Sequence, residues 1–203
     1  GPRTSRIHLR RWPGRNAEVD FKGKKRWNDT HASTTDPDAR LFRKSNNTAA
    51  QLCHMGHVLM ENRNGLVVDV DITEANARAE REAAARMLKR SARRAKSLGA
   101  DKNYDTADFV TTCRRLKVAP HVAAKKTGSA LDGRTTRQET YRVSLRIRKR
   151  IEEIFGWLKT VGGLRKSRHI GRAKLAGQLL LGCAAYNLVR IGSLNGWWDA
   201  RHS

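Results

Sequence analysis

The sequence predicts a mixed α/β fold, and three observations lead to this prediction. Two segments with strand-like composition flank an Asn-Gly turn, which is typical of a β-hairpin. Helical and strand-like segments then alternate along the chain, and long helical segments close it. The resulting order, strand–strand–helix–strand–helix–strand–helix, is typical of helices that cover a mixed sheet.

The predicted hairpin has its strands at residues 51–61 and 66–73, joined by a turn that ends in Asn64-Gly65. In the second strand, apolar side chains alternate with aspartates, so one face is expected to be buried and the other solvated. The apolar positions are Val68, Val70 and Ile72, and the polar positions are Asp69 and Asp71. We therefore expect these two aspartates to be solvated surface residues rather than catalytic ones.

Composition and periodicity predict the remaining elements. An Ala-, Glu- and Arg-rich segment predicts a helix with a basic C-terminal half, and Asp105 can cap a later helix whose apolar residues recur at helical spacing. Gly162-Gly163 separates a long basic helix from a final apolar one. The predicted elements are a helix at 75–96, a strand at 97–101, a helix after Asp105, a strand at 118–124, a loop at 125–140, and helices at 143–160 and 172–191.

The length of 203 residues is that of one ordinary domain. A chain of this size can bury roughly 70% of the surface that it exposes when unfolded, which is enough for a hydrophobic core. We expect this domain to span residues 14–192, between a basic tail without stable structure at 1–13 and a C-terminal tail at 193–203. The apolar run Leu175–Val189 is shorter than the roughly 20 residues of a membrane-spanning helix, so no membrane partner is expected. Three widely spaced cysteines favour a reducing cytoplasm over a disulfide framework.

Charge is the most unusual property of the chain. Its 42 Lys and Arg residues against 19 Asp and Glu give a formal net charge of +23. This imbalance argues against a generic metabolic enzyme and favours a polyanionic partner, of which nucleic acid is the commonest. With 38% hydrophobic and 30% charged residues, the composition is neither that of a membrane protein nor that of a wholly disordered chain.

Glu152 stands out because it lies within the most basic predicted helix. At about 100° per residue, Arg148, Glu152 and Lys159 lie within about 40° of one another beside the apolar face of this helix, whereas Glu153 points to solvent. The apolar face is formed by Ile151, Ile154, Phe155 and Leu158. A metal ion or a phosphate could lie beside this stripe. The alternative is an ordinary surface pair between Arg148 and Glu152, and periodicity alone favours that alternative.

Asp101 is the second acidic residue of interest. It follows the predicted strand that ends in Leu98-Gly99-Ala100. The carboxyl ends of strands are where α/β folds place their sites, so a catalytic role is open to Asp101. Taken alone, it fits a turn or capping aspartate better than a catalytic one.

A set of separate motifs runs along the chain. They are GRNAEVDFKGKKRWNDTHASTTDPDAR from Gly14, GHVLMENRNGLVVD, LGADKNYD, DGRTTR, the pattern Arg148-x3-Glu152-x6-Lys159, and AAYNLVR ending at Arg190. In this order they resemble the DDE transposases of bacterial insertion sequences, in particular the insertion-sequence-five-like group. The resemblance covers all but the two tails. It implies an RNase H-like fold, in which helices flank a mixed sheet.

The resemblance also implies a metal-dependent enzyme that cuts and joins DNA at the ends of an insertion sequence. Asp101 and Glu152 would be catalytic metal ligands for Mg²⁺ (or Mn²⁺), in a site where two metals lie about 4 Å apart. Arg148 and Lys159 would bind DNA phosphates. The implied partners are double-stranded DNA, both terminal inverted repeats and target, and a second copy in a homodimer. The implied location is the bacterial cytoplasm, with the nucleoid.

Two departures from the family pattern bear on activity. The family's first carboxylate lies on a strand upstream of the segment that begins here at Gly14, and residues 1–13 contain no Asp or Glu. We therefore expect the first catalytic Asp and the first strand of the sheet to be absent, and cleavage to be impaired. The family often has Tyr three residues before the Arg, where this chain has Leu145, with Tyr141 one turn earlier.

Other candidate sites are weaker. Asp36 and Asp38 belong to a turn around Pro37, and turn chemistry explains them. The sequence Cys53-His54-x-x-His57 suggests zinc, but an odd spacing places two strand residues on opposite faces, so no zinc site is expected. The alternative function is that of a non-catalytic basic protein that binds DNA or RNA, either a transposase relic or a nucleoid- or ribosome-associated chain.

Overall fold

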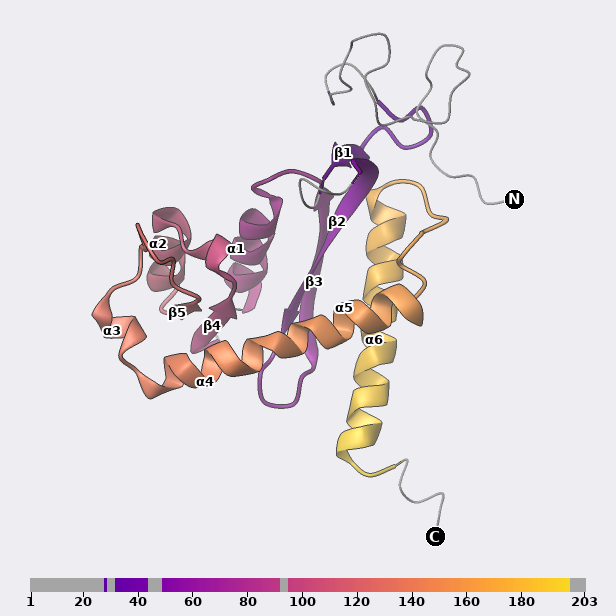
Figure 1. Ribbon diagram of the computed structural model, residues 1–203. Coiled ribbons are helices and arrows are strands. Elements are labelled where there is room, and N and C mark those ends of the chain that lie inside the picture. The colour runs from indigo at the N-terminus through magenta and orange to yellow at the C-terminus, as the bar shows by residue number, and fades with distance from the viewer. Residues whose placement is uncertain (1–27, 29–31, 44–48, 92–94, 198–203) are drawn as a thin grey trace.

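The computed structural model describes residue 28 and residues 32–43, 49–91 and 95–197 (Figure 1). The strands are β1 (Arg40–Phe42), β2 (Gln51–Met60), β3 (Val67–Glu74), β4 (Ser97–Ala100) and β5 (Ala119–Val122). The α-helices are α1 (Ala79–Ser91), α2 (Ala107–Arg115), α3 (Gly133–Thr136), α4 (Glu139–Ile147), α5 (Ile151–Thr160) and α6 (Arg172–Leu194). Two 3₁₀ turns, η1 (Lys102–Tyr104) and η2 (Arg148–Arg150), complete the list. The predicted tail at 1–13 lies outside the described residues.

The described strands form two small sheets, where the sequence predicted one mixed sheet. The sheet β1-β2-β3 is antiparallel, and the sheet β4-β5 is parallel. A mixed α/β architecture is therefore confirmed. The two sheets are separate because each packs against its own hydrophobic core. One core forms around Leu88 of α1 and Phe109 of α2, and the other around Ile154 of α5 and Leu179 of α6.

The predicted hairpin is confirmed, with β2 and β3 joined at a turn in which Gly65 has a φ of 74°, a value that favours glycine. The predicted burial of Val68 is wrong, because Met60 pairs with Val67 and Leu59 with Asp69. Val68 is thus the extra residue of a β-bulge, and its side chain is 53% exposed.

The expectation that Asp69 and Asp71 are solvated is also wrong. Helix α1 lies over their face of the hairpin, and Arg90 binds Asp69 while Arg86 binds Asp71, both through N–O distances of 2.8–3.0 Å. The two carboxylates are only 18% and 20% exposed. Both faces of β3 are therefore covered, since Val70 and Ile72 pack on the α5–α6 side.

The predicted capping role of Asp105 is a third correction. The N-cap of α2 is Thr106, whose hydroxyl accepts from the Phe109 N–H. Asp105 is fully buried and accepts hydrogen bonds from the N–H groups of Lys125 and Ala130, at 2.7 and 2.8 Å. Burial acts to raise the pKa of Asp105, but these bonds outweigh it and hold the pKa below its usual value. Asp105 thus holds the loop after β5 in place.

The long basic helix starts earlier than predicted and contains an interruption. Helix α4, η2 and α5 follow one another without a break and form one rod, which crosses from the β4–β5 sheet to α6 (Figure 1). The sequence predicted a start at Val143, but α4 begins at Glu139. The interruption at Arg148–Arg150 matters for the site, because a 3₁₀ turn has about 3.0 residues per turn instead of 3.6.

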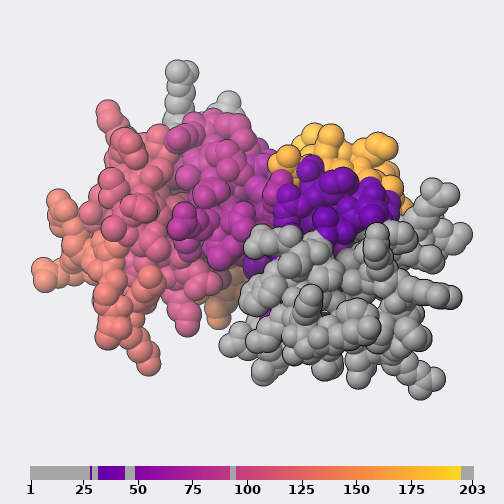
Figure 2. Space-filling model, turned by 90° about the horizontal axis from the view of Figure 1, so that it is seen from above, coloured from indigo at the N-terminus to yellow at the C-terminus, as the bar shows by residue number. Residues whose placement is uncertain are grey.

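Helix α6 is also longer than predicted, with 23 residues. By length and composition alone α6 could cross a membrane, a criterion that core helices of soluble proteins also meet. One face packs on the hairpin, where Asn187 exchanges two hydrogen bonds of 2.8 Å with the backbone of Val67. Such anchoring is typical of a packed helix of a folded domain. Figure 2 shows α6, in yellow, directly beside the first described residues, in indigo.

Candidate active site

Asp101 immediately follows β4, at the carboxyl end of the parallel sheet. Its side chain is 67% exposed and makes no capping hydrogen bond to the 3₁₀ turn that it precedes. The side chain is therefore not a helix cap, which was the simpler interpretation of this residue. It is presented to solvent at the edge of the sheet where α/β folds place their sites.

Arg148 of η2 forms an ion pair with this carboxylate, through its Nη1 and Oδ1 of Asp101. The pair joins two elements that are 47 residues apart in the sequence. It depends on a close approach between the rod and β4 at Gly99, where a Cβ atom added to the glycine would lie 3.4 Å from Cβ of Arg148. There is thus room for no more than a small side chain at position 99, since a Cβ atom would already be in van der Waals contact with the rod.

Hydrogen bonds of two side chains hold α4 against the β4–β5 sheet. Tyr141 donates its hydroxyl hydrogen to the Val122 carbonyl, at 2.9 Å, and accepts from the Ala124 N–H, at 3.3 Å. One turn later, the hydroxyl of Ser144 lies 2.7 Å from Nδ1 of the buried His121. Tyr141, the tyrosine that is displaced by one turn from the family pattern, therefore has a structural task here.

The 3₁₀ turn Arg148–Arg150 precedes Glu152, so the α-helical spacing that predicted a common stripe for Arg148 and Glu152 does not apply across it. The Arg148 side chain is 27% exposed, and its Nε is buried without a hydrogen-bond partner among the described residues. Glu152, at the start of α5, is exposed. The expected stripe in which Glu152 lies beside packed structure is thus only partly present. Arg148 reaches the sheet, while Glu152 faces outward.

Glu153 is exposed like Glu152, so exposure does not distinguish the two glutamates. The pKa of Tyr186 on α6 is raised, first by burial and then by the negative charge of Glu153. The charge of Glu153 thus bears on α6, and the preference for Glu152 as the candidate site residue comes from the sequence pattern.

Lys159, in the last turn of α5, is exposed. It is seven residues beyond Glu152 and makes no ion pair within the part of the chain that the structure describes. An exposed and unpaired ammonium group can bind phosphate without first giving up a protein partner.

The chemistry of these side chains suits a hard divalent cation. Carboxylate oxygens such as those of Asp101 and Glu152 are the ligands that Mg²⁺ and Mn²⁺ prefer. Within the described ranges, however, no cluster of three or more His, Cys, Asp or Glu side chains could hold a metal. The carboxylates that the structure describes thus fit such a metal in kind, without forming a three-ligand cluster in the described ranges.

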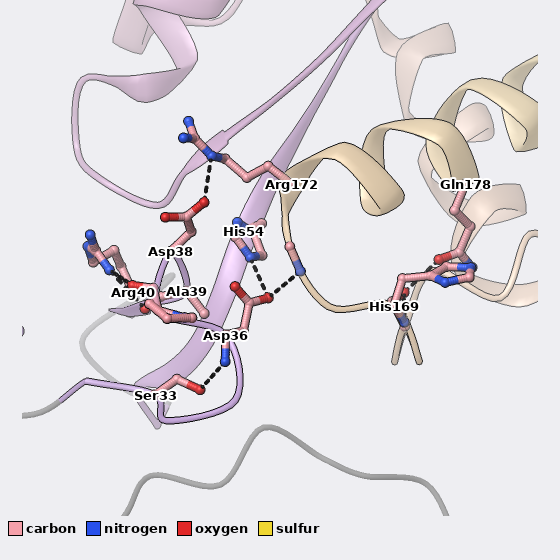
Figure 3. A network of polar contacts seen from close by, with 12 residues as sticks. Ser33, Asp36, Asp38, Ala39, Arg40, His54, His169, Arg172 and Gln178 are labelled. Atoms are coloured by element: carbon pink, nitrogen blue, oxygen red, sulfur yellow. Dashed lines mark hydrogen bonds and ion pairs between the residues drawn. The ribbon is translucent and has the colours of Figure 1, made fainter.

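Asp36 has a role that the turn interpretation missed (Figure 3). The predicted turn forms, because the Ala39 N–H donates to the Asp36 carbonyl, but the Asp36 side chain is buried. Its Oδ2 lies 3.0 Å from Nε2 of His54 and accepts from the Gly171 N–H at 3.0 Å. Burial acts to raise its pKa, and these bonds outweigh it, so the pKa of Asp36 is lowered. Nothing in the sequence pairs Asp36 with Gly171.

His54 and His57 have different hydrogen-bond partners. His54 binds Asp36, whereas Nε2 of His57 lies 2.8 Å from the hydroxyl of Thr73 on β3. The neighbouring Cys53 is a free thiol, as are Cys113 and Cys183. These residues serve packing and hydrogen bonding in the described structure.

Comparison with known proteins adds one finding. A family model described as "Transposase DDE domain" matches residues 29–188, which are most of the chain and include Asp101, Arg148, Glu152 and Lys159. No curated protein and no solved structure matches the chain.

Proposed function

The chain belongs to the DDE transposase family, and from this membership we propose that it cuts and joins DNA at the ends of an insertion sequence of the insertion-sequence-five-like group. One observation carries the proposal to particular residues. Asp101, at the end of β4, is paired with Arg148, which lies one turn before Glu152 on the same rod. Asp101 is thereby linked to the rod that carries Glu152, in a fold that we propose to be RNase H-like.

Each of the four residues has a proposed task. Asp101 and Glu152 hold divalent metal through their carboxylates. When bound, Mg²⁺ or Mn²⁺ stabilises the charge that develops on the oxygens of a phosphodiester during its displacement. Arg148 and Lys159 bind the phosphates on either side of Glu152 and offset their charge. The exposure of Asp101, Glu152 and Lys159 leaves them accessible to a duplex.

The proposal also covers the DNA substrates, the second copy of the chain and the strength of DNA cleavage. The substrates are double-stranded terminal repeats and target DNA in the bacterial cytoplasm, and two copies of the chain act together on paired ends. That cleavage is weak stays a prediction, and efficient Mg²⁺-dependent cleavage by the 203-residue chain would contradict it.

The experiment compares Glu152→Gln with Glu153→Gln, since both glutamates are exposed and adjacent. The probe is a labelled duplex with the inverted repeats that flank the coding sequence, incubated with Mn²⁺. We expect Glu152→Gln to abolish cleavage while DNA affinity is kept or slightly increased, because one negative charge is removed. Glu153→Gln is expected to cleave like the parent chain. Equal activity of the parent and Glu152→Gln would refute the assignment.

The alternative function is a non-catalytic protein that binds DNA or RNA. The net charge of +23 favours this alternative, as does the fact that the described residues do not by themselves assemble a three-ligand cluster. The same assay distinguishes the two functions. A pure binder shows no cleavage in the parent chain, and Glu152→Gln then has nothing to remove.

A further inference from the structure

The segment between α5 and α6 is unusually basic. We call residues 165–174 the basic strap. Half of its ten residues are Lys or Arg, namely Arg165, Lys166, Arg168, Arg172 and Lys174, and all five are exposed. The sequence contains no Asp or Glu between Glu153 and Asp199, so no acidic residue of the same segment offsets this positive charge.

Hydrogen bonds hold the strap in a defined position. Ser167 donates its hydroxyl hydrogen to the side chain of Gln178 on α6, at 2.6 Å, and accepts from the His169 N–H, at 3.1 Å. At the far end, the Gly171 N–H binds the buried carboxylate of Asp36 (Figure 3). A ligand that binds this segment therefore meets an ordered surface, which lowers the entropic cost of binding.

The cations of the strap are largely unpaired. Arg172 binds Asp38 at 3.2 Å, and both side chains remain about half exposed, at 48% and 44%. In the part of the chain that the structure describes, no other cation of the strap forms an ion pair. Arg86 and Arg90 of α1 differ in this respect, because the carboxylates of the hairpin neutralise them.

The start of α6 lies at the end of the strap. Its N-cap is Gly171, which has no side chain to accept from the first N–H groups of the helix. These N–H groups and the helix dipole favour an anion there, and the carboxylates of Asp36 and Asp38 already contact Gly171 and Arg172, so positive charge is partly offset at this end. Arg172 and Lys174 flank this end and are exposed.

We propose that the basic strap is a contact surface for the sugar–phosphate backbone of duplex DNA, distinct from Arg148 and Lys159. The connection between α5 and α6 runs beside α6 (Figure 1). Its positive charges follow one another along this segment, and such an arrangement can bind successive phosphates of a linear polyanion. Contacts of this kind position a duplex and carry no sequence information. The proposal rests on the proposed function only in naming DNA as the partner.

The test is a salt series of DNA binding without divalent metal. The full chain and a variant with Arg165→Gln, Lys166→Gln and Arg168→Gln are titrated onto a fluorescein-labelled duplex of scrambled sequence, and anisotropy reports binding. The slope of log K against log salt is expected to become shallower by about 1 for each lost phosphate contact, hence by about 3 for the variant. Circular dichroism checks that both proteins are folded.

A matched control removes the same charge from another surface. Arg115, Lys117 and Lys126 are exposed on the α2–β5 side and are changed to Gln together. This variant is expected to keep the parent slope. The proposal is overturned if the strap variant keeps the parent slope, or if the slope of the control variant becomes equally shallow. It is also overturned if a parallel titration with anionic lipid vesicles shows that the strap variant loses binding only to the vesicles.

The result is independent of the cleavage assay. A shallower slope in a chain that never cleaves DNA supports the strap and counts against the catalytic proposal. Cleavage that depends on Glu152, together with an unchanged slope in the strap variant, supports the catalytic proposal and refutes the strap as a DNA contact.

Discussion

Arg148 binds the carboxylate of Asp101 across 47 residues of sequence, from the 3₁₀ turn of the rod to the end of β4. The contact occupies one oxygen of the carboxylate that we assign to metal binding. If Arg148 binds DNA phosphate as proposed, it exchanges this carboxylate partner for a phosphate partner when DNA binds.

Asp101→Asn separates a catalytic role from a structural one. The ion pair is partly exposed, so its loss should change the free energy of unfolding by less than about 1 kcal/mol. The affinity for Mn²⁺ should fall at least about tenfold, because losing a metal ligand costs no less affinity than losing a residue that only hydrogen-bonds to a ligand. The decrease of the paramagnetic resonance signal of free Mn²⁺ measures this affinity. A large loss of stability with unchanged Mn²⁺ binding would make Asp101 structural.

Asp105→Asn should have the opposite effect, although this residue is only four positions away. Asp105 is fully buried and accepts from two backbone N–H groups. An amide nitrogen in place of one oxygen leaves a buried N–H without an acceptor, and we expect the free energy of unfolding to fall by about 2–3 kcal/mol. Urea denaturation measures this loss. Mn²⁺ binding by the folded fraction should match that of the parent, and a selective loss of binding would count against the structural role.

Gly99 tests whether the close approach of the rod to β4 is needed. A Cβ atom there would be in ordinary contact with Cβ of Arg148, at 3.4 Å, and with the carbonyl of Ser144, at 3.6 Å. Gly99→Ala should therefore be nearly neutral, while Gly99→Leu overpacks the contact and should lower the free energy of unfolding by about 1–3 kcal/mol. Chemical denaturation of the two variants provides the comparison. Similar stability of both would mean that the rod is not held tightly at this point.

Stability should fall as the pH is lowered from 7 toward 5. Burial lowers the pKa of His121 below the ordinary 6.5, and burial likewise lowers that of His57. The unfolded chain thus binds these protons at a higher pH than the folded chain, so folding loses stability once the pH drops below about 6.5. Asp36 and Asp105, whose pKa values are lowered from 3.8, contribute only at more acidic pH.

Thermal unfolding between pH 7 and pH 5 measures this effect. His121→Asn removes one of the two histidines, so the midpoint of thermal unfolding should depend less on pH. The variant should also lose some stability, because the contact with Ser144 is lost. A parent chain whose midpoint is constant over this range would show that the buried histidines are already protonated or are equally accessible in both states.

Features that depend on near neighbours in the chain could be predicted well. The hairpin follows from alternation and an Asn-Gly turn, and the helices follow from periodicity, although their ends move by several residues. Asp69 and Asp71 show where this method fails. Their alternation correctly indicated a strand, but a helix from the next part of the chain covers them and supplies Arg86 and Arg90.

For the site, the sequence by itself determined the candidate residues and the family, because these depend on residue types in order along the chain and on charge. Tertiary structure alone decided that Arg148 binds Asp101, that Asp105 is buried, and that Asp36 holds the start of α6. Each of these contacts joins groups from elements that are brought together only when helices pack on the sheets. Their burial and hydrogen bonds are properties of that packing and leave no periodic signal in the sequence.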